Sequence, residues 1–374
     1  MRKVGIMSMQ RIANYGSFLQ AYALKQLIEE LGCKVEFVDY HVGAPVIMEN
    51  ADSKNKFVRK VEKGLETFQY QAPFAHKLSF IRYKQTFSKK YMPLLGITDE
   101  MNYNPTLDCL VIGSDEVFNC IQKNSNVGYS LELFGKDNHA KRLLTYAASF
   151  GNTTLEKLKK YKKTEEVGAL LKKFDAISVR DANSGTIVEQ LTGKEPVYNL
   201  DPVLTYDYMN CCDKIPRVQT NEKYLILYAY AGRISNEEAE WISDYAKKKK
   251  LKVYAIGGIQ KCADRFVDCS PFEVLAYFRN AEEVITDTFH GSIFSVITHR
   301  PFTTLIRKSV GNSYGNEEKL SDLLERLELA NRMTTKIEDA ENINEKAIDY
   351  AKVDEQLKAH REVAKEYLRK KIEG

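Results

Sequence analysis

Residues 286–292 combine the groups best suited to acid–base chemistry in this sequence. They read Thr-Asp-Thr-Phe-His-Gly-Ser and follow the short apolar run Val284-Ile285. This order predicts a strand that ends in polar caps, with His290 in the first turn of the next helix. An imidazole there could hold a proton beside an anion bound at the positive helix end, although a core histidine bonded to a backbone carbonyl is the alternative. The two small residues after His290, Gly291 and Ser292, indicate an open approach by a ligand, and Thr288 is a further substrate-binding candidate.

A second candidate is Arg180, within Ser178-Val179-Arg180-Asp181. Arg180 falls where an expected strand stops, and Asp181 begins an expected helix, so the guanidinium should point past the strand end. Its planar fork of five donors suits a carboxylate or a phosphate. The alternative is an ordinary surface pair with Asp181, which would contribute little. Position at the strand end favours the ligand role.

Paired carboxylates follow the apolar run 107–112, in Gly113-Ser114-Asp115-Glu116. A carboxylate in this place could act as a general base, and Ser114 could contact a substrate. Ser and Asp also cap helices, since they accept hydrogen bonds from the first backbone amides. The sequence leaves both interpretations of Ser114 and Asp115 open.

The remaining strand ends give weaker signals. Residues 8–17 predict a turn with Ser17 as a helix N-cap, which could receive an anion or a sugar hydroxyl or could simply be a tight turn. A glycine pair after the run 252–256 indicates a close backbone approach, either to a ligand or to the next helix. The substrate-binding candidates from these ends are Asn14, Gly16, Ser17, Ser149, Gly257, Gly258 and Arg307.

Two consecutive series of alternating strands and helices must position these residues. The first predicts strands at 3–7, 34–40, 107–112, 142–148, 174–179 and 196–200, with helices at 17–31, 76–90, 156–173 and 181–192. The second predicts strands at 224–230, 252–256, 283–286 and 302–306, with helices at 235–249, 271–279, 289–299, 317–327 and 343–371. This alternation predicts an α/β protein with two Rossmann-like domains facing a central cleft, where ligands bind outside the carboxyl ends of the strands.

The expected domain limits are 1–202 for the first domain, on the acceptor side, and 223–335 for the second, on the donor side. Residues 203–222, polar and with two cysteines, are expected to be the linker. Residues 336–374 are expected to form a helix that packs back on the first domain or mediates dimerisation. Arg180 and His290 would then converge on one anionic ligand in the cleft.

Composition excludes several classes of protein. The 374 residues are 44% hydrophobic and 28% charged, as in soluble globular proteins, and no apolar run nears the ~20 residues of a membrane span. Fifty-five Lys and Arg against 51 Asp and Glu give a net charge of +4, with no concentrated basic face for nucleic acid. Seven cysteines without a CxxC pair indicate no metal site. The first residues lack a secretion signal, so we expect a cytoplasmic location.

Six motifs in this order resemble the polysaccharide pyruvyl transferase family, over about residues 3–327. They are NYGS at 14–17, GSDEVFN at 113–119, YAASFG at 146–151, SVRDANS at 178–184, LDP at 200–202 and TDTFHGSIFS at 286–295. The resemblance implies a GT-B-like fold and transfer of a pyruvyl group from phosphoenolpyruvate to sugar hydroxyls, which forms a ketal and releases phosphate. It implies no further cofactor. The saccharide acceptor could be lipid- or nucleotide-linked, and peripheral membrane contact and a homo-oligomer are both compatible.

The resemblance also implies residue roles. His290 matches the family histidine and would be the general acid that protonates the methylene carbon of the donor. Arg180 matches an arginine that holds phosphoenolpyruvate, and Asp115 would be a base or orienting group on the acceptor side. The family's Arg-x-His triplet is Thr288-Phe289-His290 here, so either Arg307 or Lys308 replaces the lost arginine or the donor differs from phosphoenolpyruvate. The alternative functions are a glycosyltransferase that uses a sugar nucleotide and a non-catalytic saccharide-binding relative.

Overall fold

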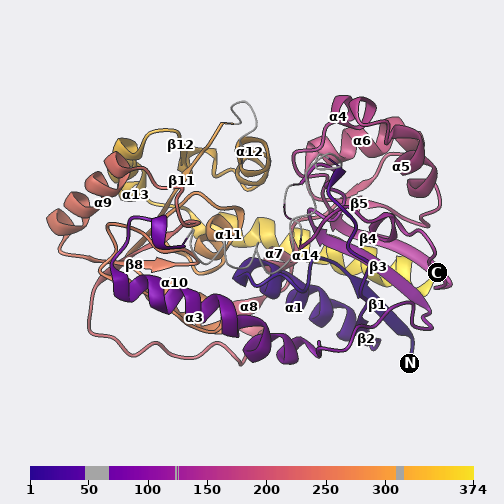
Figure 1. Ribbon diagram of the computed structural model, residues 1–374, viewed down its shortest axis with the longest axis horizontal. Coiled ribbons are helices and arrows are strands. Elements are labelled where there is room, and N and C mark those ends of the chain that lie inside the picture. The colour runs from indigo at the N-terminus through magenta and orange to yellow at the C-terminus, as the bar shows by residue number, and fades with distance from the viewer. Residues whose placement is uncertain (47–66, 123, 125, 309–315) are drawn as a thin grey trace. The chain divides into compact units, whose positions relative to one another are not determined.

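The computed structural model describes residues 1–46, 67–122, 124, 126–308 and 316–374, and the chain divides into two compact units (Figure 1). Unit 1 comprises Met1–Ala51, Tyr91–Tyr208 and Glu355–Gly374, and unit 2 comprises Asp52–Lys90 and Met209–Asp354. Each unit contains one six-stranded sheet whose described strand pairs are parallel. The predicted fold class of two Rossmann-like α/β units is therefore confirmed.

The sheet of unit 1 has the order β2-β1-β3-β4-β5-β6. Its strands are β1 (Lys3–Met7), β2 (Lys34–Phe37), β3 (Cys109–Asp115), β4 (Arg142–Ala148), β5 (Ser178–Val179) and β6 (Val197–Tyr198). The helices between them are α1 (Tyr15–Glu29), α4 (Leu155–Lys160), α5 (Thr164–Leu171) and α6 (Ala182–Thr192). Strand order reverses between β1 and β3, which is where parallel sheets of this kind bind ligands.

The sheet of unit 2 has the order β12-β11-β10-β7-β8-β9. Its strands are β7 (Tyr224–Tyr228), β8 (Lys252–Ile256), β9 (Arg265–Phe266), β10 (Glu283–Thr286), β11 (Phe302–Leu305) and β12 (Met333–Thr334). The helices are α9 (Asn236–Lys249), α10 (Pro271–Asn280), α11 (Phe289–Ile297), α12 (Glu317–Arg326) and α13 (Ala340–Glu345). Counted from β7, the strand order is that of dinucleotide-binding folds, and it reverses between β7 and β10.

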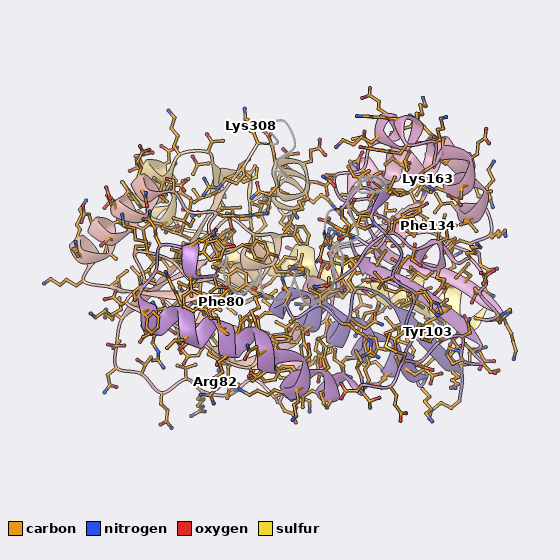
Figure 2. The ribbon with its side chains drawn as sticks, in the orientation of Figure 1. Phe80, Arg82, Tyr103, Phe134, Lys163 and Lys308 are labelled. Carbon is orange, nitrogen blue, oxygen red and sulfur yellow. The ribbon has the colours of Figure 1, made fainter. Side chains whose placement is uncertain are left out.

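The units do not follow the expected boundary at residue 202. Helix α3 (Phe74–Tyr91), expected in the first domain, groups with unit 2 up to Lys90. Phe80 of α3, labelled in Figure 2, packs edge-on against Phe266 of β9, with 5.6 Å between ring centroids. The amphipathic pattern of α3 shows that one face is buried but not which sheet covers it.

The expected linker also differs from the structure. It contains α7 (Pro202–Thr205) and α8 (Tyr208–Cys211), and unit 1 extends to Tyr208. The Tyr208 hydroxyl donates to the carbonyl of Leu19 in α1 at 2.5 Å. The polar stretch that indicated a linker therefore begins inside unit 1.

The chain ends in two helices rather than the single helix expected at 343–371. Helix α13 ends at Glu345 and α14 (Tyr350–Glu373) begins five residues later. The buried guanidinium of Arg332 donates to the carbonyls of Ile343, Lys346 and Ala347 at 2.6–3.1 Å, and these are the carbonyls at the end of α13 and in the segment before α14. From Glu355 on, α14 belongs to unit 1, where the Tyr367 hydroxyl donates to the Thr145 carbonyl of β4.

The helix expected at 156–173 is also interrupted. It forms α4 and α5, and Lys162 between them has a φ of 54°.

An aromatic cluster holds the loops that follow β3 and β4. Phe118 stacks on Phe134, which Figure 2 labels, at 4.7 Å between centroids, and its ring centroid is 5.2 Å from that of Phe150. All three rings are buried. Since Phe118 and Phe150 belong to the motifs at 113–119 and 146–151, this packing fixes the backbone beside Asp115 and Ser149.

Candidate functional site

In unit 2, His290 lies where the sequence predicts it, in the first turn of α11. Thr288 is the N-cap, and its hydroxyl accepts a hydrogen bond from the Gly291 amide at 2.9 Å. The Thr286 hydroxyl accepts from the Thr288 amide at 3.1 Å. The His290 ring is half-buried, with the Phe289 and Phe294 ring centroids at 5.5 and 6.0 Å. The local turn therefore places an imidazole at the positive end of a nine-residue helix.

The small residues after His290 serve packing. A Cβ on Gly291 would lie 2.1 Å from the Thr286 hydroxyl oxygen. Ser292 is fully buried, and its hydroxyl meets that of Thr304 in β11 at 2.9 Å. Both residues thus let α11 pack close to β10 and β11, and their contact with a ligand stays a prediction.

Asp287, in the same turn, is a buried carboxylate between cations. Its side chain is 0% exposed, and neither oxygen has a hydrogen-bond partner in the described part of the chain. One oxygen, Oδ2, lies 3.6 Å from an Nη atom of Arg233 and 4.0 Å from Nε of Arg307. Burial raises the pKa of Asp287, and the two guanidiniums only partly offset this.

Arg307 is also held by Glu238 of α9. Both of its terminal nitrogens donate to the Glu238 carboxylate, which is the bidentate geometry expected of this pair. Burial alone would raise the pKa of Glu238, but the hydrogen bonds and charge of Arg307 bring it below the ordinary value. Arg307 therefore lies at the strand edge as predicted, whereas Lys308 beside it is exposed (Figure 2).

Sequence reasoning missed Arg233. It lies in the loop after β7, and its guanidinium is 4.9 Å from the ring centroid of Tyr230. The expected strand ran to Tyr230, whereas β7 ends at Tyr228, so this loop was not recognised as a strand end. A position just past an apolar strand and two residues before the N-cap Ser235 was the available signal.

The glycine pair after β8 supports the same loop. A Cβ on Gly258 would lie 2.4 Å from both the Ala229 carbonyl oxygen and the Ala231 amide nitrogen. Gly257 has a φ of 83°, which favours glycine. The close approach indicated by the sequence is thus made to the loop that carries Arg233.

In unit 1, Arg180 lies between two carboxylates. Its terminal nitrogens contact Asp201 at 3.1 Å and Asp115 at 3.3 Å, and its side chain is 4% exposed. Burial would lower the pKa of Arg180, but the two aspartates raise it above the ordinary value. Asp181 instead caps α6 by accepting from the Ser184 amide at 2.8 Å. The guanidinium is therefore already neutralised by residues of its own unit.

Asp201 is the second residue missed. Its sequence context indicated only a turn, but its carboxylate also caps α7 by accepting from the Val203 amide at 3.0 Å. The Ser114 hydroxyl lies 3.5 Å from the same carboxylate and 3.2 Å from the Ala147 carbonyl. Ser114 is fully buried, so its hydroxyl belongs to this network.

Asp115 joins the first turn of α1 to this network. The Ser17 hydroxyl donates to Asp115 at 3.3 Å. Ser17 is not the N-cap of α1; that position is Asn14, which accepts from the Gly16 amide at 2.7 Å. The capping alternative for Asp115 is not realised, because the described chain after β3 continues as turns.

Ser149 has a local role. Its hydroxyl accepts from the Gly151 amide at 2.9 Å, and the residue is buried. This bond shapes the turn after β4.

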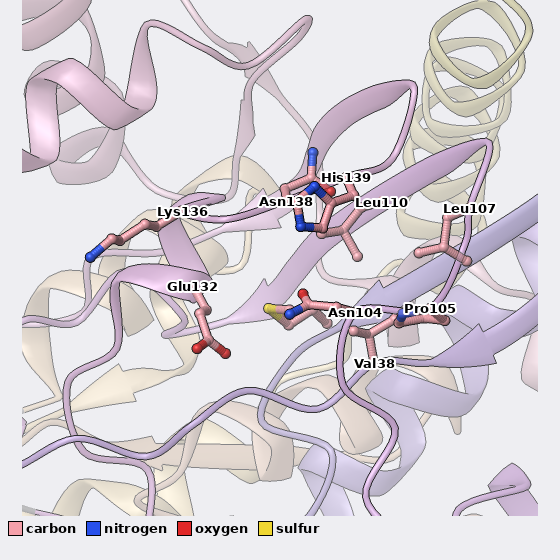
Figure 3. Close-up of a pocket in the computed structure, with 10 residues that line it drawn as sticks. Val38, Asn104, Pro105, Leu107, Leu110, Glu132, Lys136, Asn138 and His139 are labelled. Carbon is pink, nitrogen blue, oxygen red and sulfur yellow. The ribbon is translucent and has the colours of Figure 1, made fainter.

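A small pocket lies elsewhere in unit 1 (Figure 3). It is lined by Met7, Val38, Asn104, Pro105, Leu107, Leu110, Glu132, Lys136, Asn138 and His139. Its carboxylate, Glu132, already accepts a hydrogen bond from the His41 amide and pairs with the His41 ring. None of the predicted site residues lines this pocket.

Two further properties bear on the kind of site. In the described ranges, no three His, Cys, Asp or Glu side chains are arranged to hold a metal ion. No described helix combines the length and the apolar character needed to cross a bilayer.

Comparison with known proteins identifies the family. Curated protein sequences give no significant match. Solved structures with similar folds include MnaA from S. aureus with UDP (11% identity, 96% of this chain, 90% of that chain, TM-score 0.48). UDP-GlcNAc 2-epimerase from Neisseria meningitidis with UDP-GlcNAc is 10% identical over 97% of this chain and 94% of that chain, with a TM-score of 0.45. With TM-scores below 0.5, neither supports a functional assignment.

The match to a protein family covers most of the chain. The sequence model of polysaccharide pyruvyl transferases matches residues 14–309, which include the His290 and Arg180 motifs and the two residues missed above. The chain therefore belongs to the polysaccharide pyruvyl transferase family and is a transferase of polysaccharide biosynthesis.

Proposed function

We propose that this protein transfers a pyruvyl group from phosphoenolpyruvate to two hydroxyls of a saccharide, forming a ketal and releasing phosphate. The observation that carries the proposal is the position of His290 at the start of α11, at the strand edge where Arg307 also lies. Family membership supports the reaction class. An acid beside bound anionic groups is what an enol phosphate requires.

The chemistry divides into an addition and a substitution at one carbon. The His290 imidazolium gives a proton to the methylene carbon of phosphoenolpyruvate, and a saccharide hydroxyl adds to the carbon that bears the phosphate. Phosphate then leaves with its bridging oxygen, and a second hydroxyl takes its place. Of the two hydroxyl protons released, one restores His290 and the other leaves with phosphate. The helix end and Arg307 stabilise the anionic groups of the donor throughout.

In unit 1, Asp115 is the proposed base or orienting group for the saccharide hydroxyls. Its carboxylate is 15% exposed, so it remains accessible although Ser17 and Arg180 hold it. Arg180 positions Asp115 in this proposal. Two aspartates already offset the charge of Arg180. The predicted contact of Arg180 with phosphoenolpyruvate remains a prediction.

Phosphate release from phosphoenolpyruvate, in the presence of a panel of lipid- and nucleotide-linked saccharides, tests the proposal. We expect His290→Ala and His290→Gln to lower the rate by roughly 100-fold or more, which is the contribution of a general acid. His299→Gln is the matched control, because His299 follows the other end of α11 and pairs with Asp354 on the surface. This control should keep the wild-type rate.

Three outcomes would contradict the proposal. Full activity of the His290 variants would remove the acid from the mechanism. Turnover of a sugar nucleotide without any use of phosphoenolpyruvate would favour a glycosyltransferase. Calorimetric binding of a saccharide without turnover of either donor would favour a non-catalytic role.

A further inference from the structure

Arg233 has hydrogen-bond donors that the described part of the chain does not use. Among the described residues its ion-pair partner is Asp287, and the distance from Nη1 to Oδ2 is long, at 3.6 Å. The side chain is 31% exposed. A guanidinium carries five donors, so Arg233 can still bind a planar or tetrahedral anion.

The buried carboxylate of Asp287 explains why Arg233 lies at this edge. A carboxylate without hydrogen bonds is costly to bury, and such groups need a specific reason to persist. Here the reason is that Oδ2 faces the guanidiniums of both Arg233 and Arg307. Both terminal nitrogens of Arg307 already donate to Glu238. Arg233 is therefore the arginine of this pair with more N–H groups available to bind an anion.

Hydrogen bonds from several residues hold the loop that carries Arg233. The Arg233 amide donates to the Tyr230 carbonyl at 3.3 Å, and the buried Gln260 amide donates to the Ala229 carbonyl at 3.1 Å. Ser235, two residues later, forms a capping box with Glu238, the partner of Arg307. The loop that carries Arg233 therefore leads directly into the capping box whose Glu238 holds Arg307.

Residue 288 cannot supply the cation that the family's Arg-x-His triplet would place beside the histidine. Thr288 is 5% exposed, and its hydroxyl is engaged in capping α11. We infer that Arg233 binds the anionic donor, through its phosphate or its carboxylate, at the strand edge beside His290. This inference rests on the proposed function for the identity of the donor.

Calorimetric titration with phosphoenolpyruvate, inorganic phosphate and pyruvate tests the inference. We expect Arg233→Gln to weaken phosphoenolpyruvate binding about 10- to 100-fold, the range for charge-assisted hydrogen bonds. Arg233→Lys keeps the charge but loses the planar guanidinium with its paired donors. Its affinity for phosphoenolpyruvate should lie between those of wild type and Arg233→Gln. Arg265→Gln is the matched control, because Arg265 also lies over a tyrosine ring in unit 2. Thermal melting confirms that each variant is folded.

The probes identify the group that is bound. Weakened binding of phosphate alone assigns Arg233 to the phosphate, and weakened binding of pyruvate alone assigns it to the carboxylate. Wild-type affinity of Arg233→Gln for all three probes overturns the inference, while the proposed function stands if wild-type protein still releases phosphate from phosphoenolpyruvate. If wild-type protein does not turn over phosphoenolpyruvate but binds phosphate in an Arg233-dependent way, the proposed function fails and the anion site remains.

Discussion

Replacing Asp201 with Asn tests whether the Arg180 network stabilises unit 1. Asn can still cap α7, because its carbonyl oxygen can accept from the Val203 amide as Oδ1 does now. Its NH₂ group would then face the Arg180 nitrogen that now donates to Oδ2 at 3.1 Å. One charge-assisted hydrogen bond is lost, and the buried guanidinium retains Asp115 as its nearest counter-charge.

The expected loss of stability is about 3 kcal/mol, since a charge-assisted hydrogen bond contributes ~1.5–3 kcal/mol and breaking a buried pair costs ~3–5 kcal/mol. At roughly 2–4 °C per kcal/mol, this lowers the melting temperature by about 6–12 °C. The assay is thermal unfolding followed by far-UV circular dichroism. Asp207→Asn is the matched control, because the Asp207–Arg361 pair in the same unit is 20–25% exposed and should contribute less than ~1 kcal/mol.

A double-mutant cycle distinguishes the pair from a general effect of the substitution. Arg180→Met combined with Asp201→Asn should destabilise by at least ~1.5 kcal/mol less than the sum of the single variants, because each single change leaves the other charge poorly compensated. Additive losses, or a loss for Asp201→Asn no larger than for Asp207→Asn, would show that the Arg180–Asp201 pair does not stabilise unit 1.

Two further predictions concern the stability of unit 2, through Glu238 and Gly258, and the second uses Gly168 of unit 1 as its control. Glu238→Gln keeps the capping box but loses the charged pair with Arg307, so it should lower stability at pH 7. Since Arg307 holds the pKa of Glu238 below 4.5, the difference from wild type should shrink as pH falls below about 4.5, and a constant difference in pH-dependent urea unfolding would contradict this. Gly258→Ala should destabilise by ~1–3 kcal/mol, because its Cβ meets the Ala229 carbonyl at 2.4 Å. Gly168→Ala, in α5 with its nearest neighbour at 3.6 Å, should instead stabilise by ~0.5–1 kcal/mol, and equal effects of the two in the same unfolding assay would refute the contact argument.

The sequence predicted the elements whose signal is local. Strands β8 and β10 have the expected bounds, because short apolar runs between polar caps specify them. His290 is in the first helical turn as predicted, because Thr288 is a cap residue at the required spacing. The expected convergence of Arg180 and His290 on one donor remains a prediction.

What could not be predicted depends on contacts between distant segments. Arg233 and Asp287 come from different loops, and Asp201 contacts Arg180 across 21 positions, so neither pair leaves a periodic signal. Arg332, which donates to carbonyls in the break before α14, lies well outside that segment in the sequence. Single-sequence patterns identify strands, helices and caps, whereas such partners require the tertiary structure.

In the proposed reaction, a proton that exchanges with solvent is delivered to the methylene carbon of phosphoenolpyruvate, and the carbon skeleton of phosphoenolpyruvate enters the saccharide. NMR of the product made in D₂O from ¹³C-labelled phosphoenolpyruvate tests this most directly. We expect a ketal carbon bonded to two sugar oxygens, with one deuterium in the attached methyl group for each phosphate released. A modified saccharide that contains no label from phosphoenolpyruvate would contradict it.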